Sequence, residues 1–107
     1  MKTQLNQSLS KGLQVMECLF EKDFEGKTVT GVMEATGLPH ITAWRTLKTL
    51  ELCGWVREVQ RGKKQSRWIV TEKITEIAFQ YRRYVLSSIQ TIEKNYLDVA
   101  GEKLNHD

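Results

Sequence analysis

Two glycine stop signals, Gly37 and Gly54, frame the stretch that most constrains how this chain can fold. Pro39 follows the first of them, and this combination ends one helix and fixes the backbone for entry into the next. Apolar residues then recur at helical spacing until the second glycine. The chain must therefore turn sharply between a short helix, expected at about 31–36, and a longer helix, expected at about 40–53.

The longer of these helices has one apolar face and one mixed face. Ala43, Leu47 and Leu50 lie within about 40° of one another around the helix, so we expect them to face the core. The opposite arc offers hydrogen-bond donors, acceptors and methyl groups, which suits the base edges of a B-DNA major groove. Taken alone, the pattern fits equally well an ordinary helix with a solvated outer face.

We predict DNA contacts from this outer arc. Arg45 is expected to contact a guanine or a phosphate, whereas phosphates are the expected partners of His40 and Lys48. Trp44, at the boundary of the two faces, is expected to pack. The predicted contact residues are His40, Ile41, Thr42, Arg45, Lys48 and Thr49, with Thr30 at the start of the preceding helix, which it can also cap.

A basic hairpin is expected next. Apolar and polar residues alternate at about 55–60 and 66–70, and the segment between these two stretches contains a glycine suited to a hairpin loop. We predict that the cations of this hairpin contact the sugar–phosphate backbone or the minor groove. They are Arg61, Lys63, Lys64 and Arg67. The order of short helix, turn, helix and hairpin is that of a winged helix-turn-helix.

The positive charge of the chain is concentrated in the same region. The net charge is +3, yet residues 39–70 alone carry seven Lys and Arg against two Glu. Residues 1–38 and residues 71–107 each carry one more acidic than basic side chain. A cationic surface confined to one segment is typical of a face that binds phosphates. The charge pattern therefore favours nucleic-acid binding over a merely solvated helix.

Helices are also expected on both sides of this region. The first is predicted at about 9–22, with Ser8 or Ser10 as its N-cap. The last follows Thr71 and contains no Gly or Pro up to residue 100, so it would be roughly 40 Å long. We expect its far half to pair with a second copy of the chain, the alternative being a helix folded back on its own domain. The predicted dimer contacts are Ile77, Tyr81, Val85, Ile89, Ile92 and Tyr96.

Three stretches together resemble the DNA-binding domain of IclR-type transcriptional regulators. They are "SLSKGLQVMECL", "TVTGVMEATGLPHITAWRTLKTLELCGWV" and "RWIVTEKITEIA", and the match spans roughly residues 8–79. The resemblance implies that the helix at 40–53 enters the major groove, that the hairpin touches flanking backbone and that a linker helix joins protomers. It also implies DNA contacts from Thr42, Arg45 and the basic hairpin. MarR-type and ArsR-type regulators share this topology and are alternatives.

Two departures from the family limit what the resemblance implies. Such regulators continue into an effector-binding domain, whereas this chain stops at Asp107, so we expect no small-molecule effector. The family has small hydroxyl residues at the start of the recognition helix, where this chain has His40 and Ile41, so its DNA target cannot be transferred.

An enzyme is not expected. The two histidines, His40 and His106, stand outside any catalytic motif, and no phosphate-binding glycine loop occurs. Cys18 and Cys53 lack CxxC spacing and are expected to be reduced, partly buried thiols, so no metal or cofactor is predicted.

We therefore expect a mainly α-helical protein with a small β-hairpin, organised as a winged helix-turn-helix in residues 1–70 and a dimerisation helix in residues 71–107. The expected function is that of a cytoplasmic, nucleoid-associated homodimer that binds a near-palindromic double-stranded DNA site without contacting a membrane, more as a repressor than an activator. A second hypothesis is a protein-interaction module that uses Ile41, Trp44 and Leu52. RNA binding is a weaker third, since it calls for more exposed aromatic residues.

Overall fold

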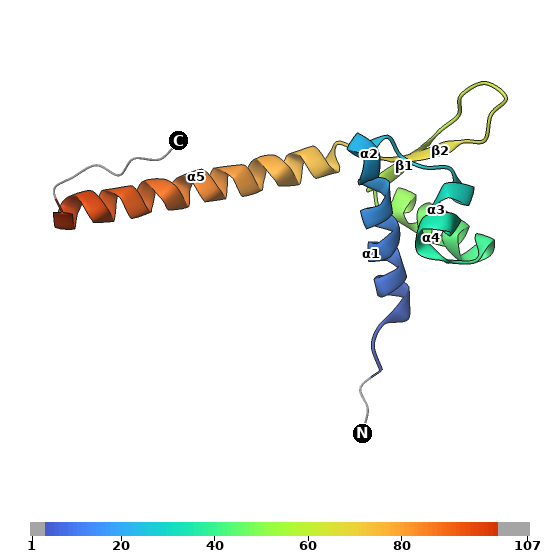
Figure 1. The fold of residues 1–107 in the computed structure, drawn as a ribbon, viewed down its shortest axis with the longest axis horizontal. Coiled ribbons are helices and arrows are strands. Elements are labelled where there is room, and N and C mark those ends of the chain that lie inside the picture. The colour runs from blue at the N-terminus through green and yellow to red at the C-terminus, as the bar shows by residue number, and fades with distance from the viewer. Residues whose placement is uncertain (1–3, 101–107) are drawn as a thin grey trace. The chain divides into compact units, whose positions relative to one another are not determined.

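The computed structural model describes residues 4–100 (Figure 1). Its helices are α1 (Gln7–Leu19), α2 (Glu21–Phe24), α3 (Val29–Thr36), α4 (His40–Leu52) and α5 (Lys73–Ala100), and its strands are β1 (Val56–Val59) and β2 (Arg67–Val70). Residues 101–107, including His106 and the end of the expected dimerisation region, lie outside the described part. The chain divides into two compact units between Ile74 and Thr75. The predicted fold class, mainly helical with one hairpin and a long last helix, is confirmed.

The first unit is built around a core shared by three helices and the hairpin. α1 packs against α3, α4 and β2, and α4 also packs against α3 and β1. Burial of these apolar side chains is the main stabilising term for a unit of this size. The buried side chains are Val15, Met16, Cys18, Leu19, Val29, Val32, Ala43, Leu47, Val56 and Trp68.

The two cysteines differ in their surroundings, which makes their reactivity a test of this core. Cys18 is 5% exposed and its thiol donates to the Val15 carbonyl oxygen at 3.1 Å. Burial raises the pKa of the Cys18 thiol, with a smaller lowering by Lys27 and a smaller raising by Glu21. Cys53 is exposed as the C-cap of α4, so the expectation that it is partly buried is wrong.

We expect a maleimide reagent at neutral pH to label Cys53 rapidly and Cys18 only after unfolding, because the reacting species is the thiolate. Mass spectrometry of peptides labelled with and without denaturant measures both rates. Equal labelling of the two thiols in the folded chain would contradict the observed burial.

The first helix begins earlier and ends earlier than predicted. Its cap is Asn6, whose side-chain oxygen accepts from the Leu9 N–H at 3.0 Å. The prediction of Ser8 or Ser10 as the cap is wrong, because both residues lie inside the helix. The expected extension of the helix to residue 22 is also wrong, because α1 ends at Leu19 with Phe20 as its C-cap, and the backbone is left-handed at Lys22.

A left-handed turn follows α1. Lys22, Asp23 and Phe24 have φ values of 52°, 58° and 62°, a conformation that costs a non-glycine residue about 1–2 kcal/mol. The ring of Phe24 packs on that of Phe20, with centroids 5.5 Å apart, which helps to offset this cost. The expected helices, at about 9–22 and 31–36, gave no sign of this turn.

Gly26 lets this turn pass directly over β2. Its φ is 84°, and a Cβ placed on it would meet the Trp68 carbonyl oxygen and, at 2.6 Å, the Ile69 Cγ2. The next residue, Lys27, then pairs with Trp68 through two backbone hydrogen bonds of 3.1 and 2.7 Å. The segment before α3 is thereby fixed to the hairpin.

The sharp turn between α3 and α4 agrees with the sequence. Gly37 has φ 76° and its N–H donates to the Met33 carbonyl oxygen at 2.8 Å, as expected of a glycine that ends a helix. α3 begins at Val29 and its cap is Thr28, whose hydroxyl accepts from the Gly31 N–H at 3.1 Å. The prediction that Thr30 caps this helix is therefore wrong, because Thr30 lies in its first turn.

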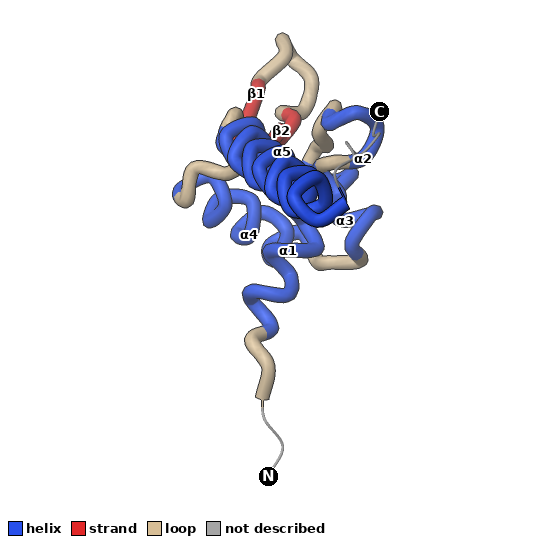
Figure 2. Tube along the Cα trace, turned by 90° about the vertical axis from the view of Figure 1, so that its left-hand side faces the viewer, coloured by secondary structure: helices blue, strands red, loops and turns tan. Residues whose placement is uncertain are grey.

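The hairpin and the last helix complete the chain. β1 and β2 pair antiparallel from Val56 opposite Val70 to Val59 opposite Arg67, joined by the loop drawn in tan in Figure 2. Before α5, the Thr71 hydroxyl accepts from the Lys73 N–H in a long contact of 3.4 Å. Within residues 4–100, no helix has the length and apolar character needed to cross a membrane.

Candidate nucleic-acid interface

The inner face of α4 holds the helix against the core. Ala43 and Leu47 are fully buried and Leu50 is half-buried, as the helical spacing predicts. The outer face is exposed, with Ile41 at 53% and Leu52 at 88%. Since the buried side chains fix the rotation of the helix, the outer side chains have defined positions.

The start of α4 also leaves hydrogen-bond donors open. Pro39 precedes the helix with φ −62° and supplies no side-chain cap, so the N–H groups of the first turn lack a side-chain partner. The helix dipole makes this end favourable for an anion. His40, predicted to contact a phosphate, is exposed here.

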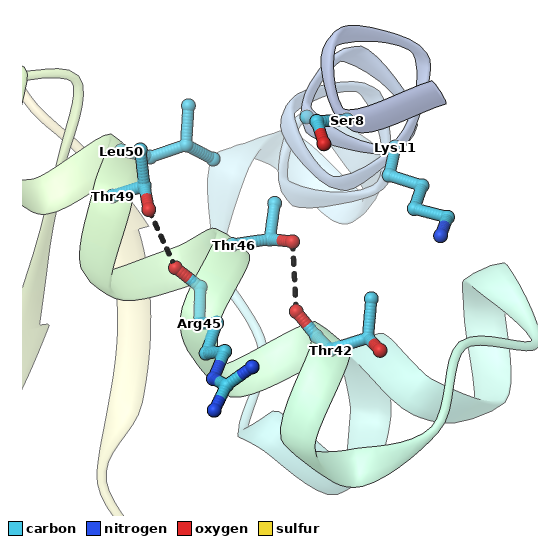
Figure 3. Close-up of a pocket in the computed structure, with 8 residues that line it drawn as sticks. Ser8, Lys11, Thr42, Arg45, Thr46, Thr49 and Leu50 are labelled. Carbon is cyan, nitrogen blue, oxygen red and sulfur yellow. Dashed lines mark hydrogen bonds between the residues drawn. The ribbon is translucent and has the colours of Figure 1, made fainter. Parts of the chain in front are cut away.

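Hydroxyl groups line the flank of α4 that faces α1, and two of them are already engaged (Figure 3). The Thr46 hydroxyl donates to the Thr42 carbonyl oxygen at 2.7 Å, and the Thr49 hydroxyl donates to the Arg45 carbonyl oxygen at 2.8 Å. These two groups can therefore accept but not donate in this rotamer. The Thr42 hydroxyl and the Arg45 guanidinium have no hydrogen-bond partner among the described residues, and both remain available as donors.

Lys48 lies on the opposite flank of α4, next to the hairpin. Its ammonium group forms an ion pair with Glu51 at 3.1 Å and lies 5.6 Å from the centre of the Trp68 ring. It also lies 5.8 Å from the ring of Trp44, which is 42% exposed. Lys48 is thus held by an acidic and two aromatic neighbours, whereas Arg45 is free of such contacts in the described part.

One amide organises the hairpin loop. The Gln60 Nε2 donates to the carbonyl oxygens of Gly62 and Lys64, at 3.0 and 2.7 Å, and its Oε1 accepts from the Ser66 hydroxyl. The cations predicted for this loop, Arg61, Lys63 and Lys64, are all exposed. Sequence reasoning missed Gln60, because its role depends on the loop closing around it.

Two further contacts connect the hairpin to the start of α3. The Gln65 Nε2 donates to the Thr30 hydroxyl at 3.4 Å, so the predicted site residue Thr30 lies beside the loop. Arg67 is half-buried and its Nη2 donates to the Gly26 carbonyl oxygen at 2.7 Å. Arg67 therefore ties β2 to the Gly26 turn, in contrast to the exposed cations of the loop.

A groove between α1 and α4 brings in side chains that the sequence did not suggest. It has a volume of about 300 Å³. Its lining residues are Ser8, Lys11, Gly12, Thr42, Arg45, Thr46, Thr49 and Leu50. Lys11 and Ser8 were missed because they lie far from the basic segment in sequence, and only the packing of α1 on α4 brings them next to it.

The residues predicted for dimerisation all lie on α5. Ile77, Tyr81, Ile92 and Tyr96 are 44%, 66%, 60% and 39% exposed within the single chain. Their spacing places them along one side of the helix.

A second apolar surface lies in the first unit, where a cavity of about 420 Å³ is bordered by side chains of α1, α4 and the segments flanking the hairpin. These side chains include Leu9, Leu13, Phe20, Leu50, Trp55 and Ile74.

No metal site is found in the part of the chain that the structure describes. Nowhere within residues 4–100 do three His, Cys, Asp or Glu side chains come together as possible ligands.

Comparison with known proteins identifies relatives of the first unit. Residues 8–60 match the IclR helix-turn-helix domain family. The chain is 28% identical over 101 residues to the transcriptional repressor IclR of Escherichia coli K12, and 29% identical over 101 residues to the acetate operon repressor of Salmonella typhimurium LT2. Each alignment covers 92% of this chain but only 35% of the relative, so the chain spans about a third of their length.

Solved structures share the fold. A protein named as a transcriptional regulator from Rhodococcus sp. RHA1 superposes with a TM-score of 0.56 and 31% identity, over 72% of this chain and 27% of that one. TubR of Bacillus thuringiensis serovar israelensis, solved bound to 24 bp of tubC, gives a TM-score of 0.53 over 78% of this chain and 99% of its own. Its identity is 17%, which shows similarity of fold alone.

Proposed function

Residues 8–60 are an IclR helix-turn-helix domain, and on this premise we propose that the chain is a homodimeric transcription regulator that binds double-stranded DNA. The observation that carries the proposal is the two-sided character of α4. Ala43 and Leu47 are fully buried, while Thr42 and Arg45 keep free donors on the other side. α4 enters the major groove, where Arg45 donates to a guanine edge or a phosphate.

The hairpin supplies the sequence-independent part of the affinity. Arg61, Lys63 and Lys64 are exposed on a loop that Gln60 holds in shape, so they can contact sugar–phosphate backbone beside the groove that α4 occupies. Thr30 and His40 add contacts near the helix starts. Lys48 is the weakest of the predicted contacts, because Glu51 and two indole rings already engage its ammonium group.

Self-association rests on the two apolar surfaces described above. The stripe on α5 is exposed within one chain, and Leu9 and Leu13 on α1 are 60% and 57% exposed. Pairing two copies along α5 removes the apolar stripe of this helix from water. Two copies of α4 then meet successive major grooves about 34 Å apart, on a site with near two-fold symmetry. The named relatives are repressors, which favours repression over activation.

Selection of bound duplexes from a random pool tests the whole proposal, because one result reports binding, sequence preference and half-site symmetry. Recovery of an enriched, near-palindromic sequence is expected. An unenriched pool, together with no anisotropy change on any duplex at low salt, would refute DNA binding.

Replacing Arg45 with Ala should weaken binding to the selected duplex by about 1–3 kcal/mol, or roughly 5- to 150-fold, because it removes a forked donor. Fluorescence anisotropy at fixed salt measures the change. Arg83→Ala is the matched control, since Arg83 is exposed on α5 away from the apolar stripe. Equal effects of the two substitutions would show that Arg45 acts only through net charge.

A second candidate function is supported by the exposed apolar groups of α4. Leu52 is 88% and Ile41 is 53% exposed, which also suits a surface that binds another protein. The two functions are separated by paired variants. Loss of activity in Ile41→Asp with full activity in Arg45→Ala would favour protein binding, whereas loss of activity in Arg45→Ala supports DNA recognition.

A further inference from the structure

The groove between α1 and α4 has a lining suited to an anion. Two cations, Lys11 and Arg45, border it, and no carboxylate does. Figure 3 shows Ser8 and Lys11 on α1 beside the hydroxyl-bearing flank of α4. Lys11 forms no ion pair or hydrogen bond with any residue in the described part of the chain. It is half-buried, so part of its stem is already held against the protein.

The free hydrogen-bond donors of the groove are matched to an acceptor ligand. The hydroxyl hydrogens of Thr46 and Thr49 are used within α4. The donors that stay open among the lining side chains are those of Ser8, Lys11, Thr42 and Arg45. A phosphate group offers only acceptor oxygens, so it conflicts with none of these donors.

The groove lies on the flank of α4 opposite the hairpin. On one flank of α4, Lys48 contacts Trp68 of β2. On the other flank, Thr42 and Thr46 border the groove together with Lys11. A helix seated in the major groove has a phosphate row on each side. The hairpin can reach one row, and the first turns of α1 are placed to reach the other.

We propose that Lys11, assisted by the Ser8 hydroxyl, binds a backbone phosphate of the duplex that α4 contacts. This contact rests on the proposed function and adds α1 to the interface. It is sequence-independent, since a phosphate has the same structure at every base pair. The occupant is a phosphate of DNA, because Arg45 and Thr42 belong both to this groove and to the outer surface of α4.

The test uses the full chain with Lys11→Gln and, as matched control, Lys94→Gln, which removes an exposed charge on α5. Affinity is measured by anisotropy across a range of salt concentrations. Lys11→Gln should weaken binding about three- to tenfold on specific and unrelated duplexes alike. The slope of log K against log salt should become shallower by about 0.9 per half-site, with no change in the control.

A second measurement locates the phosphate. A single neutral methylphosphonate is placed at each position along the selected duplex in turn. At one position this substitution should lower the affinity of the wild-type chain for the duplex but leave the affinity of Lys11→Gln unchanged. The outcomes separate the two proposals. Absence of DNA binding by the unmodified chain overturns the proposed function, whereas normal binding with an unchanged slope in Lys11→Gln overturns only the α1 contact. Thermal unfolding checks that the variants are folded.

Discussion

Replacing Gly26 with Ala should destabilise the first unit by about 3 kcal/mol or more and lower its melting temperature by more than about 10 °C. Two costs add at this position. An L residue at φ 84° is strained, and the new methyl group meets the Trp68 carbonyl oxygen and Ile69 Cγ2. The Trp68 carbonyl group is not free to move, because Trp68 is buried and its backbone pairs with Lys27. Thermal unfolding followed by circular dichroism measures the loss.

Gly37→Ala separates the two costs. Gly37 has a similar φ of 76°, yet nothing lies within 4 Å of a Cβ placed there. We expect this variant to lose only about 1 kcal/mol, from backbone strain alone. If Gly26→Ala and Gly37→Ala lost the same stability, the close passage of the Gly26 turn over β2 would be refuted.

Replacing Ile89 with Asp should convert the proposed dimer to a monomer and lower affinity for a two-half-site duplex by about 100-fold or more. A carboxylate in an apolar helix pair must lose its hydration without a partner, which disfavours association. A monomer then binds each half-site independently and loses the gain of linked binding. Sedimentation equilibrium reports the assembly, and anisotropy with one-site and two-site duplexes reports the coupling.

The neighbouring residue supplies the control. Gln90 is exposed and lies about 140° around α5 from Val85, so Gln90→Asp adds the same charge away from the stripe. It should leave both the assembly and the affinity unchanged. A full-length chain that is already monomeric, or an Ile89→Asp variant that stays dimeric, would contradict the assignment of α5 as the dimer contact.

Local sequence signals predicted the architecture well where one residue type has one dominant reason to occur. Gly37 ended α3, Ala43 and Leu47 marked the buried face of α4, and a glycine-bearing basic loop separated two strands. These features depend on backbone preference and on periodicity, which a short window of sequence contains.

The features that sequence analysis missed depend on tertiary packing or on cooperation between residues. The left-handed turn at Lys22 is unfavourable by local preference and is held in place by its surroundings. Asn6, Ser8 and Ser10 are all residue types that can cap a helix. Asn6 is the cap because α1 begins at Gln7, and the sequence did not predict that starting residue. Arg67 looked like one more hairpin cation, but its partner, Gly26, lies 41 residues away in sequence. Lys11 entered the candidate site through the packing of α1 on α4.

The hydrogen bonds of Gln60 have a consequence for how the hairpin loop meets a partner. A loop shaped by its own amide contacts loses little conformational entropy when it binds, so less of the interaction energy is spent on ordering. The backbone positions that carry its cations are also fixed relative to one another before binding. Such a loop adapts poorly to a duplex of different shape, so in the proposed complex we expect it to discriminate by groove width and helical curvature, at base pairs that no side chain touches.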